Sequence, residues 1–522
     1  MKRRDFLKAG TVMVGAGASA AAFPSGSAQA QSLEHDWEQH DWGGGPAVPD
    51  RLYQGPFSNY GPQANVPGGG VVMATTPSRE TVPNFGMGLT AYVSGDIGPP
   101  RLPGQSLEQA IEDIIALPFT QKVYLRLNWR EIQKRPGRLD LPEWWCISFA
   151  IARQYGKRVG FRVMLENPDF PEPGMPDFLM GKVPYVPLKG NWPGDRSQIR
   201  HRKKQAMPRY DHPAYQAGFG ELNALLAEAL NGSPDVEYMD TMMYGFWGEG
   251  HCWPFEGNIF PSNFIAEQTW MGMLETQLRT WTKTPLVTNT QPDFNDVGNA
   301  AMLDRTVRTG NWIRSDTIFI ENTQIEALSN RPAWTAAISE AGMTTGEPGQ
   351  LGLDDGVTSN EQIIDHVLAV GANYWSIWNW HNIAAAHIRS YSDKYPEAID
   401  HIARRIGYRV YPAFIWAFER DGATGVVIGL ANDGVAGVPG VLRLTLVDKA
   451  GAVKASGCVD PGYPKPVGIR QAMLIWRGRD DWAGLRLKAE LEVKGMRYPL
   501  RWACRQTLNA DGTLTLRRNI AG

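Results

Sequence analysis

Eight short apolar runs that alternate with helix-like stretches constrain the fold of this sequence more than any other feature. Several runs are apolar nearly throughout, which is typical of strands buried on both faces. They span residues 86–93, 122–127, 158–165, 237–245, 285–289, 309–315, 334–339 and 373–378, with 317–321 an alternative for the sixth. Helical patterns lie between them at residues 106–117, 142–155, 213–230, 263–281 and 360–370. This alternation predicts an α/β fold, a (β/α)8 TIM barrel over residues 84–407.

The pattern changes after about residue 408, where short alternating runs are separated by tight turns. These runs span residues 414–418, 425–430, 441–447, 472–476, 489–493 and 513–517. Sequences such as Glu419-Arg-Asp-Gly422 are typical of the turns between antiparallel strands. Residues 408–522 are therefore predicted to form a C-terminal antiparallel β-sandwich. Residues 31–83, which are rich in Gly, Pro and Asn, are predicted to be an extended N-terminal lead-in.

The first 30 residues are predicted to be a targeting segment rather than part of the fold. Lys2-Arg3-Arg4-Asp5-Phe6 has the form of a twin-arginine export signal, and Ala28-Gln29-Ala30 fits a small-x-small cleavage site. Such a signal implies passage through the twin-arginine translocase and a periplasmic or secreted location. No other run reaches 18 apolar residues, so no membrane span is predicted.

Charge, cysteine and histidine content argue against several function classes. The formal charge of −2 argues against a dedicated nucleic-acid binder. Four cysteines in 522 residues are too few for a disulfide scaffold. Pairing of Cys458 with Cys504 stays open, and Cys146 is predicted to be a core thiol. The nine histidines show no His-Glu-x-x-His spacing, and no dinucleotide-binding glycine motif lies in a βαβ unit, so neither a metal nor a cofactor is predicted.

Carboxylates follow the fourth and seventh predicted strands. In a (β/α)8 barrel the functional groups lie at the C-terminal ends of the strands, which places Glu249 and Glu340 at the barrel mouth. Glycosidic cleavage needs one carboxylic acid to protonate the leaving oxygen and one carboxylate to attack or stabilise the sugar. We therefore predict Glu249 and Glu340 as the catalytic pair, with Glu321 and Glu347 as alternatives for the second position.

Other polar and aromatic residues near the strand ends are predicted to contact the substrate. They are Arg126, Asn128, Trp129, Arg162, Trp247, His251, Asn289, Arg314, Asp316, Trp378 and Trp380. Indole rings stack on the C–H faces of sugars, and the chain has 19 Trp, but core packing explains any single one equally well. The arginines either pair with carboxylates for structural reasons or bind substrate. His251 either orients Glu249 or packs its own loop.

A basic run, Arg196-Ser-Gln-Ile-Arg200-His-Arg202-Lys203-Lys204, lies in a long insertion after the third predicted strand. Insertions at that end of a barrel strand lie over the catalytic face. Two interpretations stay open for the run: it contacts an acidic sugar, or it forms a solvated loop.

Two stretches resemble known families. The run Tyr124-x-Arg126-x-x-Trp129, with Pro136-Gly137 and residues 158–164, is similar to the clan A glycoside hydrolases around strands two and three. Residues 233–236 and the later Gly245-Phe-Trp-Gly-Glu249 are similar to a little-characterised bacterial barrel family, a domain of unknown function with a Gly-x-Trp-Gly-Glu motif. The clan A resemblance implies a retaining mechanism with Glu249 as acid/base and Glu340 as nucleophile. Gly248 departs from that clan, which usually has Asn before the acid/base.

Together these features predict an exported retaining glycoside hydrolase that acts on an oligo- or polysaccharide. The alternative is a non-catalytic carbohydrate-binding or scaffold protein on a degenerate barrel. A retaining nucleophile has to be ionised while its partner is protonated. We therefore expect Arg126 to lie near Glu340 and lower its pKa, and the charge of Glu340 to raise the pKa of Glu249.

Overall fold

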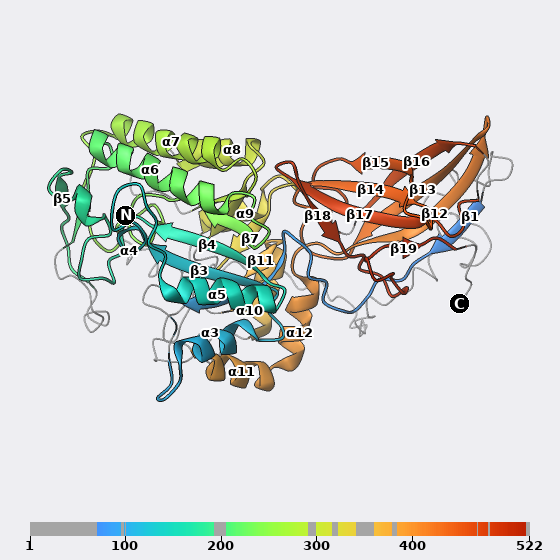
Figure 1. The fold of residues 1–522 in the computed structure, drawn as a ribbon, viewed down its shortest axis with the longest axis horizontal. Helices are drawn as coiled ribbons and strands as arrows, with labels where there is room; N and C mark the ends of the chain where they lie inside the picture. Colours follow the sequence, from blue (N-terminus) through green and yellow to red (C-terminus); the bar gives the residue numbers. More distant parts are fainter. Residues whose placement is uncertain are drawn as a thin grey trace, which may run out of the picture.

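Eight parallel strands close into a barrel in the larger part of the molecule (Figure 1). The computed structural model describes residues 70–94, 99, 101–192, 205–290, 299–315, 322–340, 360–377, 384–466, 468–478 and 481–517. Around the barrel the strands are β2 (Gly88–Ser94), β3 (Lys122–Asn128), β4 (Arg158–Met164), β7 (Val236–Asp240), β8 (Leu286–Asn289), β9 (Trp312–Ser315), β10 (Ala337–Ser339) and β11 (Tyr374–Trp375). Strand β11 pairs with β2 and closes the ring. The predicted TIM barrel is confirmed, and the alternative sixth strand at 317–321 lies outside the described residues.

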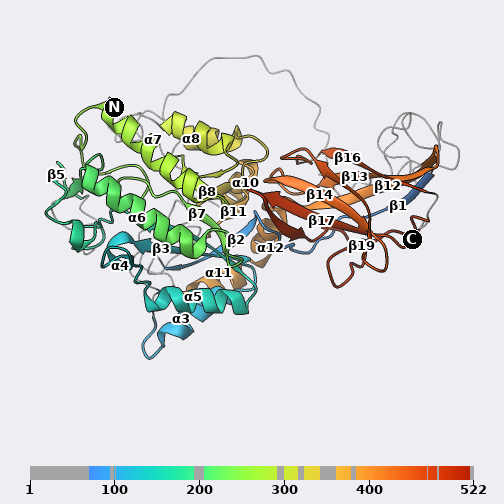
Figure 2. The ribbon, with the colours of Figure 1, turned by 45° about the horizontal axis from the view of Figure 1, so that its top comes forward.

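Helices surround the barrel and cover its outer face (Figure 2). The five predicted helices are α3 (Leu107–Ile115), α5 (Glu143–Gln154), α6 (Pro213–Leu230), α7 (Asn263–Thr280) and α10 (Asn360–Ala369). The others are α4 (Trp129–Ile132), the 3-10 helix η4 (Asp177–Leu179), α8 (Asn299–Arg308), α9 (Asn322–Ser329), α11 (Ala385–Lys394) and α12 (Pro396–Arg405). Helix α3 begins with a capping box between Ser106 and Gln109, and its apolar stripe buries Ile111 and Ile114.

The insertion after β4 contains a small two-stranded sheet. Its strands are β5 (Tyr185–Pro187) and β6 (Ala206–Pro208), which pair antiparallel. The basic run at residues 196–204 lies outside the described residues, so its predicted contact with an acidic sugar stays a prediction.

Two antiparallel sheets form the C-terminal part, which confirms the predicted sandwich (Figure 1). One sheet holds β1 (Gly70–Ala74), β12 (Val410–Arg420), β13 (Ala423–Asn432) and β16 (Ile469–Arg477). The other holds β15 (Val453–Val459), β14 (Val441–Val447), β17 (Arg486–Val493), β18 (Met496–Leu500) and β19 (Leu514–Thr515). Alternate residues of β14 are buried, so the two-residue period of a strand places Leu442, Leu444 and Leu446 in the core.

Part of the predicted lead-in belongs to the sandwich. Residues Gly70–Ala74 form β1, which pairs antiparallel with β12 along the edge of the four-stranded sheet. The expectation of an extended lead-in over residues 31–83 is therefore wrong for this segment. Its apolar sequence, Gly-Val-Val-Met-Ala, fits an edge strand whose partner lies more than 300 residues away.

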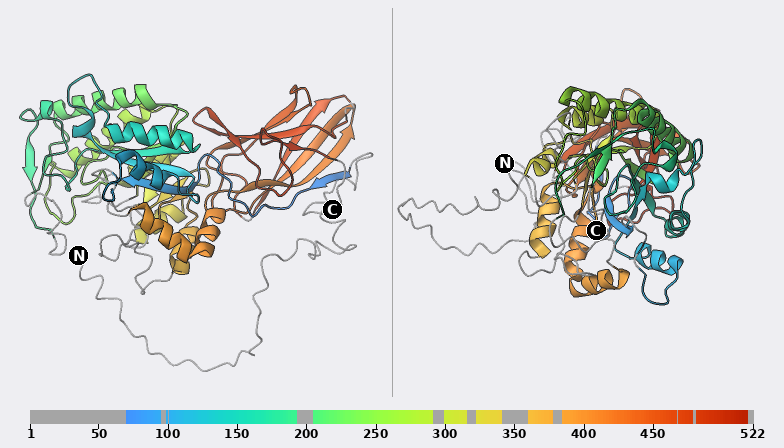
Figure 3. Two further views of the ribbon diagram at one scale, coloured as in Figure 1. Left: turned by 60° about the horizontal axis from the view of Figure 1, so that its bottom comes forward. Right: turned by 90° about the vertical axis from the view of Figure 1, so that its left-hand side faces the viewer.

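The sandwich packs against the N-terminal end of the barrel, where the strands begin (Figure 3). Tyr498 of β18 stacks on Phe85, with ring centroids 3.5 Å apart and planes at 2°. The guanidinium of Arg158, at the start of β4, lies 4.9 Å from the centroid of the Tyr498 ring. Lys494 Nζ donates to Trp281 O (2.5 Å) at the end of α7. These contacts lie at the end of the barrel opposite the C-terminal strand ends that carry the predicted site.

Replacing Tyr498 by alanine is expected to lower the free energy of unfolding by roughly 3 kcal/mol, because a buried aromatic ring is lost from a packed interface. The residue is 7% exposed. Substrate affinity should not change, because the ring lies at the far end of the barrel from the predicted site. Urea unfolding checks the first expectation. Met473→Ala is the control, since Met473 is 58% exposed and should change stability little. Equal losses in both variants would contradict the prediction.

All four cysteines are free thiols in the structure, so Cys458 and Cys504 do not pair. Cys146 is exposed on α5, and its prediction as a core thiol is wrong because the buried face of that helix is formed by Trp145, Ser148 and Ala152. None of the helices within the described ranges is both long and apolar enough to cross a membrane. Among the same residues, no group of three or more His, Cys, Asp or Glu side chains is arranged to hold a metal ion.

Candidate active site

Three arginines lie inside the barrel near the C-terminal ends of its strands. Arg126 comes from β3, Arg162 from β4 and Arg314 from β9, and each is at most 6% exposed. Alternate side chains of a strand share a face, so the side chain of Arg126, like that of Tyr124, points into the barrel interior. A buried guanidinium is costly unless a counter-charge accompanies it. The structure supplies three carboxylates for the three arginines: those of Asp240, Glu249 and Glu340.

Asp240 is the last residue of β7 and is 1% exposed. Its Oδ2 accepts from Tyr124 Oη (2.6 Å), from Arg162 Nε (2.9 Å) and from Arg314 Nη1 (2.9 Å). Two guanidinium groups also lie over the ring of Tyr124, with their carbons 5.7 Å (Arg126) and 5.0 Å (Arg314) from its centroid. One carboxylate oxygen at the end of β7 thus joins its own strand to three others, β3, β4 and β9.

Glu249 lies in a tight loop after β7 in which glycine is required. Gly245 has a φ of +87°, and a Cβ on it would lie 2.4 Å from the carbonyl oxygen of His251. Trp247 also has a positive φ, 54°, which is uncommon for a large side chain. Its N–H donates to Glu166 O (3.0 Å), which fixes the loop on the chain that continues β4. The loop thereby brings Glu249 back over the barrel mouth.

Three neighbours hold Glu249 as a carboxylate. Arg162 Nη1 lies 3.0 Å and Arg126 Nη1 3.6 Å from Oε1, while His251 Nε2 lies 3.2 Å from Oε2. His251 Nδ1 accepts from the Trp253 N–H (3.2 Å), so the ring proton lies on Nε2 and is donated to Glu249. Burial alone raises the pKa of Glu249. The hydrogen bond from His251 and the charges of Arg162 and Arg126 outweigh burial and hold the pKa at about 2.

The expectation that Glu340 raises the pKa of Glu249 is therefore wrong for the free protein. Two guanidinium groups and an imidazole touch this carboxylate directly, and together they lower its pKa despite its burial. His251 contacts Glu249 directly, and its role in orienting that carboxylate stays a prediction.

Glu340 follows β10 directly and contacts two arginines. Arg126 Nη2 and Arg314 Nη2 both pair with its Oε1, and the residue is 5% exposed. Arg126 is thus in contact with both predicted catalytic carboxylates, as expected for a residue between them. A cavity of about 10 Å³ lies beside Glu340 in the barrel interior, at the lower limit for one water molecule. A cavity of this size is too small for a substrate molecule.

Because the pKa of Glu249 is low, we expect this residue to change how the free energy of unfolding depends on pH in the acid range. A carboxylate whose pKa falls from 4.5 to about 2 on folding stabilises the fold above pH 4.5, and this contribution is lost as the pH falls through 2. Its size is roughly 3 kcal/mol, since each pKa unit corresponds to about 1.4 kcal/mol. We expect the stability difference between wild type and Glu249→Gln to shift by this amount in favour of the variant between pH 5 and pH 2, as measured by urea unfolding. A difference that does not change with pH would contradict the assignment.

The other residues that were predicted to contact the substrate lie at the mouth, in the core or outside the described residues. Asn128 ends β3, donates to Glu131 Oε2 (2.8 Å) and accepts from Asn167 (3.0 Å). Asn289 ends β8 and is buried. Trp247 is half-buried, and its Nε1 donates to Asp169 Oδ2 (2.8 Å). Asp316, Glu321, Glu347, Trp378 and Trp380 lie outside the described residues, so their roles stay predictions.

The prediction that Trp129 contacts substrate is wrong. Its side chain is fully buried, its Nε1 donates to Gln133 Oε1 (2.7 Å), and its ring packs edge-on against Tyr215. The residue begins α4 just after β3, and the short helix turns the indole into the core between the barrel and α6.

Asp240 was not predicted as a site residue. The predicted fourth strand extends to residue 245, which places Asp240 in its middle rather than at its end. The strand stops earlier because the chain turns into the glycine loop that carries Glu249. The sequence signal that could have identified Asp240 is a carboxylate at an inward-facing position, five residues before Gly245.

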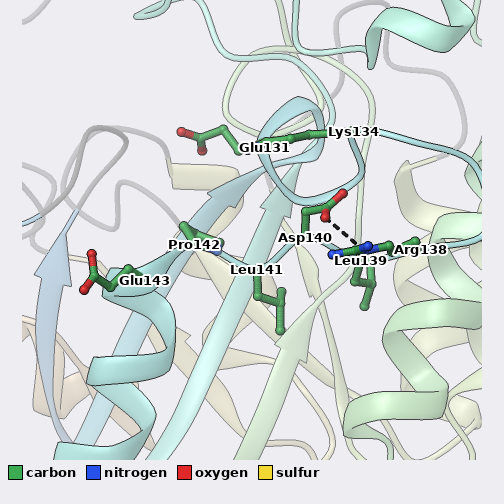
Figure 4. Close-up of a pocket in the computed structure, with 8 residues that line it drawn as sticks. All are labelled: Glu131, Lys134, Arg138, Leu139, Asp140, Leu141, Pro142 and Glu143. Atoms are coloured by element: carbon green, nitrogen blue, oxygen red, sulfur yellow. Dashed lines mark ion pairs between the residues drawn. The ribbon is translucent and has the colours of Figure 1, made fainter.

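A hollow of about 520 Å³ lies beside the mouth, between α4 and α5 (Figure 4). It is lined by Glu131, Lys134, Arg138, Leu139, Asp140, Leu141, Pro142 and Glu143. Arg138 Nε and Asp140 Oδ1 form an ion pair (3.1 Å) within it. These lining residues include no aromatic ring, so ring stacking cannot hold a sugar there.

Comparison with known proteins yields weak structural likenesses only. No protein-family model matches the chain, and no curated protein matches its sequence. One similar solved structure is endo-glycoceramidase II from Rhodococcus sp., at 12% identity over 75% of this chain and 96% of that chain, with a TM-score of 0.36. Another is a family 39 glycoside hydrolase from Bacteroides cellulosilyticus WH2, at 11% identity over 76% and 82%, with a TM-score of 0.35. Because both TM-scores are below 0.5, no conclusion about this chain rests on them.

Proposed function

We propose that the protein is a glycoside hydrolase in which Glu249 and Glu340 are the two reacting carboxylates. The observation that carries the proposal is that both carboxylates contact the single guanidinium of Arg126 at the C-terminal mouth of the barrel. Glycosidic cleavage needs two carboxyl groups on either side of one bond. Side chains at this end of a (β/α)8 barrel are also those that face substrate.

We infer the roles of the two carboxylates from their surroundings. Glu340 touches two guanidinium groups, which favour the ionised form that a nucleophile requires. It attacks the anomeric carbon as the bond to the leaving oxygen breaks, and Glu249 gives its proton to that oxygen. In the second step Glu249 takes a proton from water, which attacks the same carbon and releases Glu340. The ionised state of Glu249 in the free protein suits this second step.

The first step requires a proton on Glu249, and a pKa of about 2 opposes this at neutral pH. A bound glycan that displaces water from the mouth raises this pKa, since burial disfavours the charged form. The proposal therefore implies faster hydrolysis of natural glycans at acidic pH.

The low pKa of Glu249 also favours a second candidate, a carbohydrate-binding protein that does not hydrolyse its ligand. If Glu249 stays ionised in the complex, its carboxylate accepts hydrogen bonds from sugar hydroxyls but protonates nothing. The two candidates differ in one outcome, the appearance of new reducing ends.

Incubation of the purified protein with a panel of neutral and acidic glycans between pH 4 and pH 8 tests the proposal. We expect new reducing ends with at least one glycan, fastest at the acidic end, and a rate roughly 10²–10⁴-fold lower with Glu249→Gln. Glu143→Gln is the matched control, because Glu143 is an exposed carboxylate at the start of α5 that touches neither reacting group. Saturable glycan binding without hydrolysis at any pH would instead support the binding protein.

We also propose that the chain is exported by the twin-arginine route to the periplasm or beyond. Arg3-Arg4 and Ala28-Gln29-Ala30 support this proposal. These residues lie outside the described ranges. Fractionation of cells expressing the wild type and an Arg3→Lys, Arg4→Lys variant tests it. Equal export of both would contradict it.

A further inference from the structure

We propose that Asp240 is a positioning residue that holds both reacting carboxylates in place through Arg162 and Arg314. The proposal rests on the function proposed above and adds to it a residue that touches no substrate. Asp240 lies at the end of β7, and its Oδ2 accepts from Arg162 Nε and Arg314 Nη1, both at 2.9 Å.

Each of these two arginines also contacts a different reacting carboxylate. Arg162 uses Nη1 to reach Glu249 Oε1 (3.0 Å), and Arg314 uses Nη2 to reach Glu340 Oε1. A guanidinium is a rigid planar fork, so fixing one nitrogen fixes the direction of the others. Asp240 thereby sets where both carboxylates are held, although it contacts neither of them in the structure.

The contacts of Arg162 extend the effect to the loop that carries Glu249. Arg162 Nη1 also donates to Trp247 O (3.1 Å), two residues before Glu249. If Asp240 no longer anchors Nε, the contacts that Nη1 makes with the loop backbone and with the Glu249 side chain are displaced together. Positions of this kind matter because a displacement of about 1 Å can cost roughly 100-fold in rate.

Asp240 also balances charge. Together with Glu249 and Glu340 it offsets Arg126, Arg162 and Arg314, so the six groups carry no net charge. Among these six described groups, Asp240→Asn leaves one positive charge in excess. This excess favours ionised carboxylates, so Glu249 in the complex should lose its proton at lower pH.

Kinetics and crystal structures of Asp240→Asn test the proposal. We expect kcat to fall by roughly 100-fold with KM changed less than about threefold. The alkaline limb of the pH–rate profile should move to lower pH by about one unit. In the crystal structure of the variant, the guanidinium groups of Arg162 and Arg314 should be displaced together with the carboxylates that they contact. Unchanged positions of both arginines, or an unmoved alkaline limb, would overturn the proposal.

Glu237→Gln is the matched control, because Glu237 is a buried carboxylate on the same strand at the opposite end of the barrel. It accepts from Lys122 Nζ (2.8 Å), Tyr374 Oη (2.7 Å) and Gly86 N (2.8 Å). Both variants should lower the unfolding midpoint, but only Asp240→Asn should move the pH profile. The same shift in both would reduce Asp240 to a structural role and overturn the proposal.

Two further results separate the possible failures. If Asp240→Asn does not fold, Asp240→Glu can be tested instead, because it keeps the charge but moves it by one methylene. Its kcat should fall while its alkaline limb stays at the wild-type pH. A wild-type kcat in Asp240→Glu would overturn the proposal. A wild-type protein that hydrolyses no glycan refutes the proposed function. The positions of Arg162 and Arg314 in the variant crystal then decide the positioning role on their own.

Discussion

Replacing Glu340 by glutamine is expected to lower kcat on natural glycans by roughly 10⁴-fold or more, as the loss of a covalent nucleophile does in other enzymes. An amide does not attack the anomeric carbon, and it leaves Arg126 and Arg314 without their common counter-charge. Steady-state rates on the best glycan of the panel measure the loss, with Glu143→Gln as the control.

Glu340→Ala adds a test that loss of activity alone does not provide. The smaller side chain leaves room for an external anion such as azide to attack in place of the carboxylate, so azide should restore turnover of an activated aryl glycoside and yield a glycosyl azide. A loss of only a few-fold in either variant would show that Glu340 binds substrate rather than reacting with it.

Replacing Glu249 by glutamine is expected to slow natural glycans by roughly 10²–10⁴-fold, the usual contribution of a general acid. Aryl glycosides with very good leaving groups need no proton for the first step, so the enzyme should still be glycosylated by them. The second step lacks its base, so the glycosyl-enzyme should accumulate and produce a burst of phenol.

The pH profile of Glu249→Gln provides the contrast with wild type. In the wild type, the rate on natural glycans should fall as the pH rises and Glu249 loses its proton. In the variant this alkaline limb should disappear. Near-normal activity of Glu249→Gln on a natural glycan would remove Glu249 from the mechanism.

The barrel could be predicted from sequence because its strands are short runs buried on both faces, and runs of this kind stand out against the amphipathic helices between them. Strand β3 is buried along its whole length, and α6 begins and ends at the residues that its Pro start and apolar pattern indicate. The first strand of the sandwich was missed because β1 takes its partner from β12, far along the chain. No local pattern reports such a pairing.

Part of the candidate site could be predicted from the sequence for a similar reason. Residues at strand ends meet at one end of a barrel, so Arg126, Arg162, Arg314, Glu249 and Glu340 could be gathered from topology alone. The ionised state of Glu249 could not be predicted, because it depends on which groups are within contact distance. Trp129 could not be told from a surface indole, because one turn of helix decides whether the ring faces the mouth or the core.

Labelling with 2-deoxy-2-fluoroglycosyl fluorides identifies the nucleophile directly. The fluorine slows both steps, and the good leaving group lets the first step proceed without the acid, so a retaining enzyme is trapped as its glycosyl ester. Peptide mapping by mass spectrometry after incubation with a panel of these sugars locates the adduct. We expect one adduct on Glu340, absent in Glu340→Gln and still formed in Glu249→Gln. An adduct on Glu321 or Glu347 would contradict the assignment of the nucleophile, and hydrolysis with inversion and no adduct would contradict the retaining mechanism.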